Sequence, residues 1–174
     1  VPTDFRPPIF ELTRETGKNM NTYGSFPSVR MRRMRRNEFS RRLMREHVLT
    51  SNDLIYPVFV IEGTRRTQAI ASMPGVRRHT LDKLLPVAEQ CLELGVPVMA
   101  LFPAIEPSLK TPDGIEAINP DGLIPRVIAE LKRRFPELGV MADVALDPYT
   151  SHGQDGVLDD TGYIINDETL SVLE

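Results

Sequence analysis

The chain has 174 residues, 41% hydrophobic side chains and a formal net charge of -3, values typical of one globular domain with a substantial core. No apolar run approaches the roughly 20 residues that cross a bilayer, so no membrane partner is expected. The opening VPTDFRPPIF lacks a basic segment followed by an apolar core, so we predict no secretory signal and a cytoplasmic location. The single cysteine, Cys91, excludes an internal disulfide and a multi-cysteine zinc site, and its helical context predicts plain core packing.

The N-terminal part of the chain divides into a predicted tail and a predicted arm. Residues 1–28 carry several prolines and glycines and little periodicity, which predicts a flexible tail. Residues 29–52 form the arm, in which NEFSRRLMRE (37–46) has the spacing of one short basic amphipathic helix. Arginines crowd this arm, whereas no lysine or arginine follows Arg134, so the two ends of the chain are expected to attract one another within or between subunits.

From residue 53 onward, segments with the apolar pattern of buried strands alternate with segments that have helical spacing. SMPGV (72–76) and the segment 106–119 are expected to be loops. After the last strand we predict a β-hairpin over 156–166 and a helix that begins at Asn166 or Asp167 as its cap. The predicted strands cover residues 54–63, 96–103 and 140–146, and the predicted complete helices cover 81–95 and 119–139.

This order of elements predicts an α/β fold. Nearly continuous apolar strands are typical of a parallel sheet that is covered on both faces, which leaves a doubly wound sheet or a barrel. Three parallel strands and part of a third helix would leave a sheet edge unpaired. We therefore expect residues 53–174 to be the front part of a longer domain, interrupted within its third helix.

The stretch DVALDPYTSHGQDG (143–156) holds the candidate site residues, because ligands of parallel α/β folds bind at the carboxyl ends of the strands. Alternation along a third strand that extends to residue 146 would place Asp143, Ala145 and Asp147 on one side. The two carboxylates would then be roughly 13 Å apart if the strand stayed extended, and less after the bend at Pro148. Asp155 is expected to close on Asp147.

Clustered carboxylates allow two kinds of chemistry, and a structural alternative stays open. They bind Mg²⁺, which prefers oxygen ligands, or they share a proton because like charges raise one pKa. Alternatively Asp147, Asp155 and His152 are ordinary turn residues that cap backbone N–H groups. Asp159 and Asp160 are predicted to be hairpin-turn residues.

The run DVALDPYTSHGQDG, together with NEFSRRLMREHVLTSNDLIYPVFVIEG, SMPGV, ALFP and RFPELG, resembles the porphobilinogen synthase family, also called delta-aminolevulinic acid dehydratase. The resemblance extends from about Arg30 to the last residue. It implies a (β/α)8 TIM barrel, of which this chain would supply the first three strands and two helices behind an extended N-terminal arm. The implied reaction is a hydro-lyase step of tetrapyrrole (heme) biosynthesis that condenses two 5-aminolevulinate molecules into porphobilinogen with loss of water.

The resemblance also implies roles for individual residues. Asp143 matches the active-site aspartate of the family and would assist proton transfer near the substrate. Ala145, Asp147 and Asp155 stand where the zinc-using branch has three cysteines, so zinc is not expected at this loop, and the pattern resembles the aspartate-rich branch associated with Mg²⁺. The predicted catalytic residues are therefore Asp143, Asp147 and Asp155, with Asp147 and Asp155 as metal ligands.

Two further expectations concern the subunits and the lysines. The family resemblance implies that the arm wraps a neighbouring barrel in a homo-octamer, which we favour over nucleic-acid binding because few aromatic residues accompany the arginines. The family forms Schiff bases through two lysines on later strands, which this chain lacks, so we expect it to be inactive by itself. The alternatives are a non-catalytic assembly or regulatory fragment that binds full-length subunits, and another metal-dependent barrel lyase or aldolase. The four lysines of the sequence are Lys18, Lys83, Lys110 and Lys132.

Overall fold

The computed structural model of the chain describes residues 24, 26–27 and 29–174, so the predicted tail lies almost entirely outside the described residues. The chain divides into two compact units, Val1–Val48 and Leu49–Glu174. The described part of the first unit contains two short helices, α1 (Arg33–Arg36) and α2 (Glu38–Leu43). The helix predicted over 37–46 corresponds to α2, which has Asn37 as its N-cap and ends three residues earlier than predicted, whereas α1 was not predicted.

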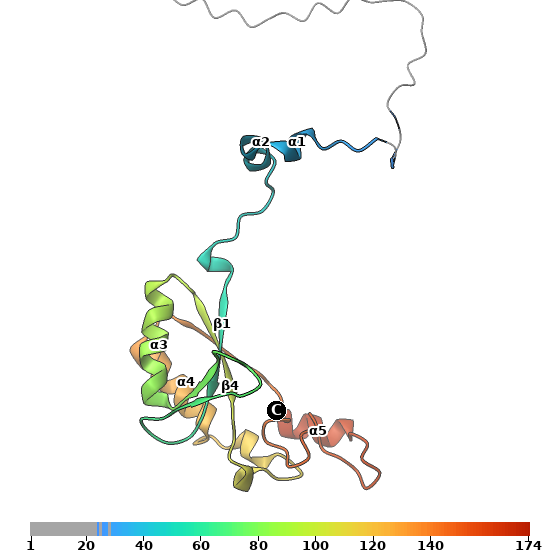
Figure 1. The fold of residues 1–174 in the computed structure, drawn as a ribbon. Helices are drawn as coiled ribbons and strands as arrows, with labels where there is room; N and C mark the ends of the chain where they lie inside the picture. The colour runs from blue at the N-terminus through green and yellow to red at the C-terminus, as the bar shows by residue number, and fades with distance from the viewer. Residues whose placement is uncertain (1–23, 25, 28) are drawn as a thin grey trace, which may run out of the picture. The chain divides into compact units, whose positions relative to one another are not determined.

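The second unit is built on a five-stranded mixed sheet in the order β2-β3-β1-β4-β5 (Figure 1). β1 pairs in parallel with β3 and β4, and β4 with β5, whereas β2 runs antiparallel to β3 at the edge. The three predicted strands correspond to β1, β4 and β5 and pair in parallel as expected, but the sheet is mixed because it also contains β2 and β3. β2 and β3 escaped prediction because each has three residues and neither has an apolar pattern. The strands are β1 (Ile55–Val60), β2 (Thr67–Ala69), β3 (Arg77–His79), β4 (Val98–Pro103) and β5 (Gly139–Ala142).

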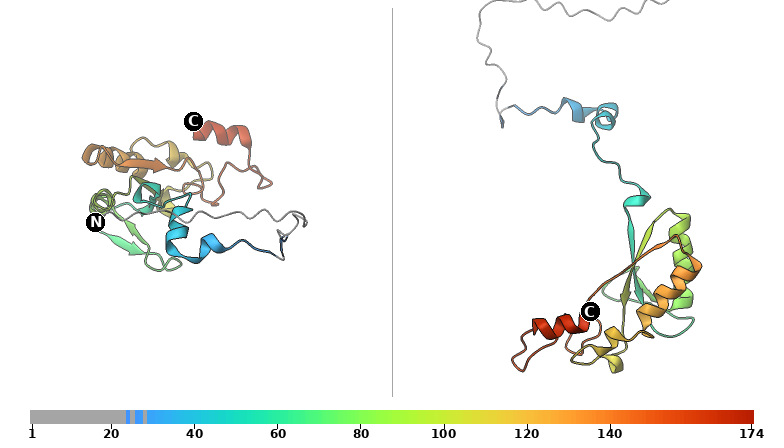
Figure 2. Two further views of the ribbon diagram at one scale, coloured as in Figure 1. Left: turned by 90° about the horizontal axis from the view of Figure 1, so that it is seen from above. Right: turned by 180° about the vertical axis from the view of Figure 1, so that it is seen from behind.

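Side chains from alternate strand positions pack under a layer of two helices, α3 (Leu81–Glu93) and α4 (Leu123–Arg134), which lie beside each other on one side of the sheet (Figures 1 and 2). Apolar residues at helical spacing form the buried side of each helix. Cys91 belongs to this core, as the sequence predicted, and burial raises the pKa of its thiol. The fully buried members of the core include Val60, Leu84, Ala88, Met99, Leu131 and Leu138.

The other side of the sheet is also apolar but less covered. The rings of Phe59 and Phe102, which are paired neighbours on β1 and β4, lie 5.9 Å apart at their centroids. Toward the strand beginnings and the sheet edge, Ile55 is 49% exposed and Met141 is 47% exposed. Apolar residues on both sides of a parallel sheet are typical of an α/β architecture in which both sides become buried.

The remaining elements follow the carboxyl ends of the strands. The predicted hairpin over 156–166 is reduced to one antiparallel bridge between Leu158 and Ile164. The final helix, α5 (Asn166–Leu173), has Ile165 as its N-cap, so the prediction of an Asn166 or Asp167 cap is wrong. The segment predicted as a loop over 106–119 contains two 3-10 helices, η2 (Pro107–Leu109) and η3 (Ile115–Ile118). None of the helices in the described residues is long and apolar enough to cross a membrane.

We predict that Leu131→Ala lowers the free energy of unfolding by about 2–5 kcal/mol, because Leu131 is fully buried between α4 and the sheet and its removal leaves a cavity. Leu94→Ala is the matched control, since Leu94 is 65% exposed and its truncation is expected to cost about 0.5 kcal/mol or less. Urea unfolding followed by circular dichroism measures both. Equal losses in the two variants would contradict this assignment of the core.

Candidate functional site at the carboxyl ends of β4 and β5

Asp143 directly follows β5. The last paired residues of the two strands are Leu101 and Ala142, so the chain leaves the sheet one residue before the aspartate. The prediction of a strand through residue 146, with Asp143, Ala145 and Asp147 alternating along it, is wrong. The apolar residues of VMADVAL continue to Leu146, whereas pairing with β4 stops at Ala142, so the sequence pattern overestimates the strand.

Asp143 lines a cavity of about 350 Å³ at this end of the sheet. Ile118 from η3, Ile124 from α4 and Val172 from α5 contribute apolar walls, and Tyr149 lines the same space. Burial, and then the nearby charge of Glu116, raise the pKa of the Tyr149 phenol, so it stays protonated near neutral pH. The cavity thus combines an acceptor carboxylate with a neutral hydroxyl donor among apolar walls, which is the character of a small-molecule site. Sequence reasoning missed Tyr149, although its place in DPYT next to the aspartates was a usable signal.

Asp147 and Asp155 occupy the loop that follows Asp143, but they do not line this cavity. Asp147 is exposed in a turn in which the N–H groups of Tyr149 and Thr150 donate to the carbonyl of Leu146 at 2.8 and 2.9 Å. Asp155 Oδ1 accepts a hydrogen bond from the Leu146 N–H at 2.6 Å. Asp155 therefore closes on the residue next to Asp147 and fastens the two ends of the loop to each other.

The donor atoms of the loop fit only part of a metal site. Within residues 24, 26–27 and 29–174, no three His, Cys, Asp or Glu side chains lie close enough together to hold a metal ion. The carboxylates of Asp147 and Asp155 are hard oxygen donors, which suit Mg²⁺ and not a thiolate-bound zinc. Since Mg²⁺ is commonly held by one or two carboxylates and several waters, these two residues fit a water-rich Mg²⁺ site and not a closed protein cage.

His152 and Asp159 have partners that belong to the loop structure. The His152 ring nitrogens lie 2.9 Å from the Pro112 carbonyl and 3.1 Å from the Gln154 N–H. Asp159 Oδ1 accepts bonds from the backbone N–H groups of Thr161 and Tyr163. These bonds, with that from the Thr161 hydroxyl as the main cause, lower the pKa of Asp159. Asp159 is thus in the turn where the sequence placed it.

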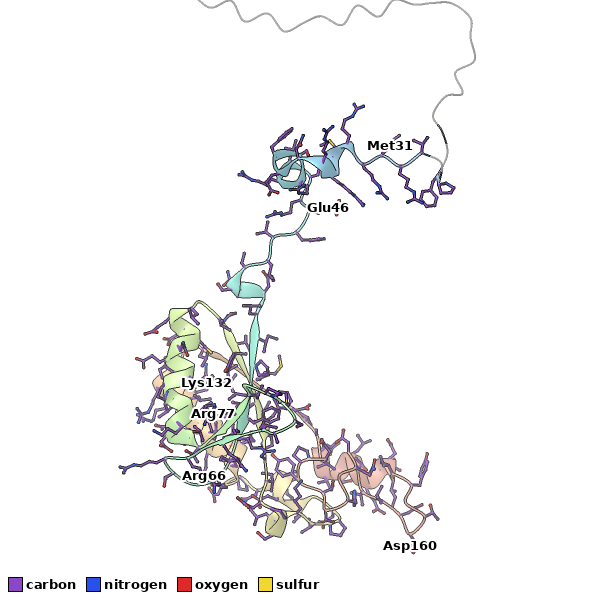
Figure 3. All side chains as sticks on the ribbon, in the orientation of Figure 1. Met31, Glu46, Arg66, Arg77, Lys132 and Asp160 are labelled. Atoms are coloured by element: carbon purple, nitrogen blue, oxygen red, sulfur yellow. The ribbon has the colours of Figure 1, made fainter. Side chains whose placement is uncertain are left out.

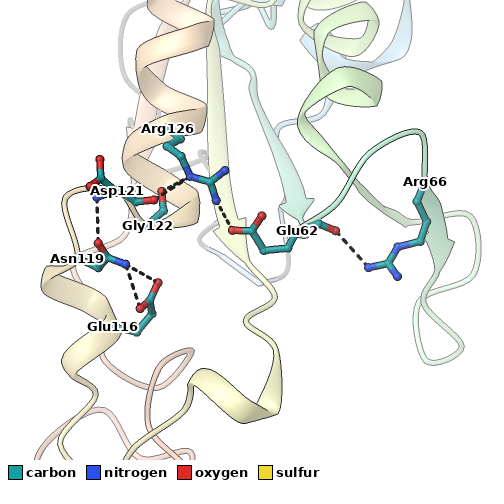
Figure 4. Close-up of polar contacts among 7 residues, drawn as sticks. All are labelled: Glu62, Arg66, Glu116, Asn119, Asp121, Gly122 and Arg126. Carbon is teal, nitrogen blue, oxygen red and sulfur yellow. Dashed lines mark hydrogen bonds and ion pairs between the residues drawn. The ribbon is translucent and has the colours of Figure 1, made fainter.

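A polar network joins the loop after β1 to the start of α4 (Figure 4). The Arg126 guanidinium forms an ion pair with Glu62 and donates through Nε to the Asp121 carbonyl at 2.8 Å. The Glu62 carbonyl in turn accepts from Arg66 at 3.2 Å. Pattern reasoning could not find this network, because Glu62 and Arg126 are far apart in the sequence. It fixes two carboxyl-end loops against each other beside the candidate site.

The lysines of the described part have no place on a strand. Lys83 lies in α3 and Lys110 in the loop after β4. Lys132, labelled in Figure 3, lies in α4, and its ammonium donates to the Pro136 and Leu138 carbonyls at 2.6 and 2.8 Å. That ammonium group closes the C-terminal end of the helix. Lys18 falls outside the described residues.

A mixed sheet with a helical layer on one side, and a cavity lined by Asp143 at the carboxyl ends of its strands, defines the class as an α/β protein whose candidate site lies where such folds bind ligands. The family model for "Delta-aminolevulinic acid dehydratase" matches residues 28–174. The chain belongs to the delta-aminolevulinic acid dehydratase family.

Individual relatives agree with this family. The chain is 49% identical over 146 residues to the delta-aminolevulinic acid dehydratase of Bradyrhizobium diazoefficiens, an alignment that covers 84% of this chain and 41% of the relative. It is 42% identical over 148 residues to that of Rhodobacter capsulatus, with 85% and 44% covered. A crystal structure of the Toxoplasma gondii ME49 enzyme, in complex with the reaction product porphobilinogen, superposes with a TM-score of 0.79 at 42% identity, covering 83% of this chain and 41% of that one. The chain therefore spans less than half the length of these relatives.

We predict that Asp155→Ala loosens the loop around Leu146, because the Leu146 N–H loses its acceptor. The local opening free energy should fall by about 1 kcal/mol, read as faster hydrogen exchange of the Leu146 amide. Asp155→Asn keeps an oxygen at the same position and should change exchange less, and Asp160→Ala serves as the exposed control. Unchanged exchange at Leu146 in Asp155→Ala would show that the carboxylate does not hold this loop.

Proposed function

We propose that the complete natural protein is a porphobilinogen synthase, which condenses two 5-aminolevulinate molecules into porphobilinogen with loss of water. The observation that carries the proposal is the family match over residues 28–174, which includes the aspartate loop and the cavity beside it. A relative whose structure holds porphobilinogen supports the choice of product. Because the chain spans less than half of these relatives, the activity is assigned to the complete polypeptide.

In this proposal Asp143 accepts and returns protons beside the bound substrate. Asp143 lines the cavity directly after β5, so a substrate amine or carbon acid bound there would lie near its carboxylate. The Tyr149 phenol, kept protonated by burial and by the charge of Glu116, is a hydrogen-bond donor on the same cavity wall.

The loop is proposed to belong to the magnesium-type branch of the family. Oxygen donors at Asp147 and Asp155, and alanine at position 145, replace the three cysteines of the zinc-using branch. Asp147 and the free oxygen of Asp155 would hold the ion, and Asp155 Oδ1 stays on the Leu146 N–H. A bound Mg²⁺ supplies positive charge that stabilises developing negative charge on an oxygen.

The arm is proposed to pack on a neighbouring subunit of a homo-oligomer, an octamer by the family resemblance. Its large apolar side chains support a partner, since Met31 is 83%, Phe39 71% and Leu43 77% exposed within the described residues. Exposed apolar groups flanked by arginines are typical of a protein contact surface. We also propose that the complete protein is located in the cytoplasm.

A second candidate function is a non-catalytic assembly partner of full-length subunits. It is favoured by one observation: the lysines that the structure describes, at 83, 110 and 132, lie on helices or in a loop. A Schiff-base lysine must instead be desolvated beside the substrate. The 174-residue chain alone is accordingly expected to form no porphobilinogen, and product formation by this purified chain would contradict that expectation.

We predict that Asp143→Asn in the complete natural polypeptide lowers the rate of porphobilinogen formation by about 10²–10⁴-fold, because the proton-transfer group is lost while the cavity shape is kept. Product is followed by the colour reaction of the pyrrole. Asp160→Asn, an exposed carboxylate in the hairpin turn, is the matched control and should leave the rate unchanged. A complete polypeptide that forms no porphobilinogen from 5-aminolevulinate would overturn the proposed function.

Metal removal separates the magnesium proposal from the activity itself. Chelation by EDTA is expected to lower activity at least several-fold, and Mg²⁺ should restore it whereas Zn²⁺ should not, because the loop offers oxygen and no thiolate ligands. The double variant Asp147→Ala, Asp155→Ala should lose the response to Mg²⁺. Full activity after chelation, or recovery with Zn²⁺ alone, would place the protein outside the magnesium-type branch.

A further inference from the structure

The aspartate loop rests on a segment that the sequence showed as part of a plain loop. Residues 111–115, here called the strap, follow β4 and form a parallel bridge between Thr111 and Thr150. The Thr111 N–H donates to the Tyr149 carbonyl at 3.2 Å, and the Ser151 N–H donates to the Thr111 carbonyl at 3.0 Å. The strap thus acts as a one-residue strand alongside the loop that carries Asp147 and Asp155.

The strap holds its own shape through a tight turn. The Thr111 hydroxyl donates to Asp113 Oδ1 at 2.6 Å, and the Gly114 N–H donates to the Thr111 carbonyl at 3.2 Å. The bond from Thr111 is the main cause that lowers the pKa of Asp113. Gly114 has a positive φ of 65°, and a Cβ there would meet a methyl of Thr150 at 3.3 Å. The strap is therefore preformed and packs closely on the aspartate loop.

His152 joins the loop to the strap through both ring nitrogens. Nε2 lies 2.9 Å from the Pro112 carbonyl, which can only accept, so Nε2 carries the proton and donates. Nδ1 lies 3.1 Å from the Gln154 N–H, which can only donate, so Nδ1 is unprotonated and accepts. The two partners fix one ring orientation, with Nε2 toward Pro112 and Nδ1 toward Gln154.

Two more bonds close the loop around this histidine. The Thr150 hydroxyl donates to the Gln154 carbonyl at 2.8 Å, and Asp155 accepts from the Leu146 N–H. Residues 146–155 therefore form a closed unit whose ends cannot move apart independently. The loop that carries Asp147 and Asp155 is therefore the unit that the contact between His152 and Pro112 holds on the strap.

We propose that His152 is a positioning residue: its Nε2–H bond to the Pro112 carbonyl sets the aspartate loop on the strap and so fixes where Asp147 and Asp155 lie. The inference rests on the proposed function for its effect on catalysis, but the positioning itself does not. Residues that orient ligating groups without touching the reacting atoms commonly change metal affinity or activity by about 10–100-fold when removed.

The test compares three substitutions of His152 in the complete natural polypeptide. His152→Ala removes both bonds. His152→Gln carries an amide N–H at about the distance of Nε2 and can still donate to Pro112, whereas His152→Asn is one methylene shorter and cannot reach. Asp160→Asn, an exposed carboxylate in the turn between Leu158 and Ile164, is the control.

Two readouts are expected to follow the Pro112 bond. Hydrogen exchange of the Ser151 and Thr111 amides should become at least 10-fold faster in the Ala and Asn variants and return to near the wild-type rate in the Gln variant. The concentration of Mg²⁺ that half-restores porphobilinogen formation after EDTA treatment should rise about 10-fold in Ala and Asn, again with recovery in Gln. The KM for 5-aminolevulinate at saturating Mg²⁺ should change little.

The outcomes separate the two proposals. Equal behaviour of the Gln and Asn variants in the exchange measurement, or wild-type exchange in all three, overturns the positioning role of His152. If the wild-type polypeptide forms no porphobilinogen, the proposed function fails, and the exchange pattern alone decides the positioning. A thermal midpoint that is lower in His152→Ala, but not in His152→Asn or His152→Gln, would show that the Ala variant is destabilised. The comparison of the Asn and Gln variants then decides the positioning role.

Discussion

The parallel register of β1, β4 and β5 is the constraint on which the rest of the described fold depends. β4 pairs residue by residue with β1 up to Pro103 and with β5 up to Ala142, so the three strands end at one edge. A shift of one residue would turn Val60 and Leu101 away from the helical layer and expose them to water. Gly139 protects this register, because a Cβ there would lie 2.9 Å from a methyl of Val98.

The common end of the strands brings together loops that are remote in the sequence. The loop after β1 contacts the start of α4 through Glu62 and Arg126, and the strap after β4 pairs with the loop after β5. The aspartates are therefore held by loops from neighbouring strands and not by one loop alone.

The sequence predicted the parts of the fold with strong periodicity. β1, β4, α3 and α4 were found within a few residues of their observed ends, because long apolar runs and helical spacing reflect burial directly. β2 and β3 were not found, because such short polar strands form only where a neighbouring strand pairs with them and have no apolar pattern of their own. β5 was predicted too long, since its apolar run continues beyond Ala142, the last residue that pairs with β4.

The candidate site was predicted in part. Carboxylates after a buried strand predicted a site at the carboxyl ends of the strands, and Asp143 lines a cavity there. The sequence could not show that Asp147 and Asp155 lie outside that cavity, or that His152 contacts Pro112, which precedes it by 40 residues. Such contacts depend on which loops the sheet places side by side, and periodicity along the chain carries no information about them.

In the proposed function, the loops after β4 and β5 form the surface that binds the substrate. The most direct measurement is hydrogen exchange of the complete natural polypeptide with and without porphobilinogen, followed peptide by peptide. If these loops bind the ligand, protection from exchange should increase in residues 111–118 and 143–155 and stay unchanged in α3 and α4. Protection confined to α3, α4 or the beginnings of the strands would show that the ligand binds elsewhere and would contradict the proposed binding surface.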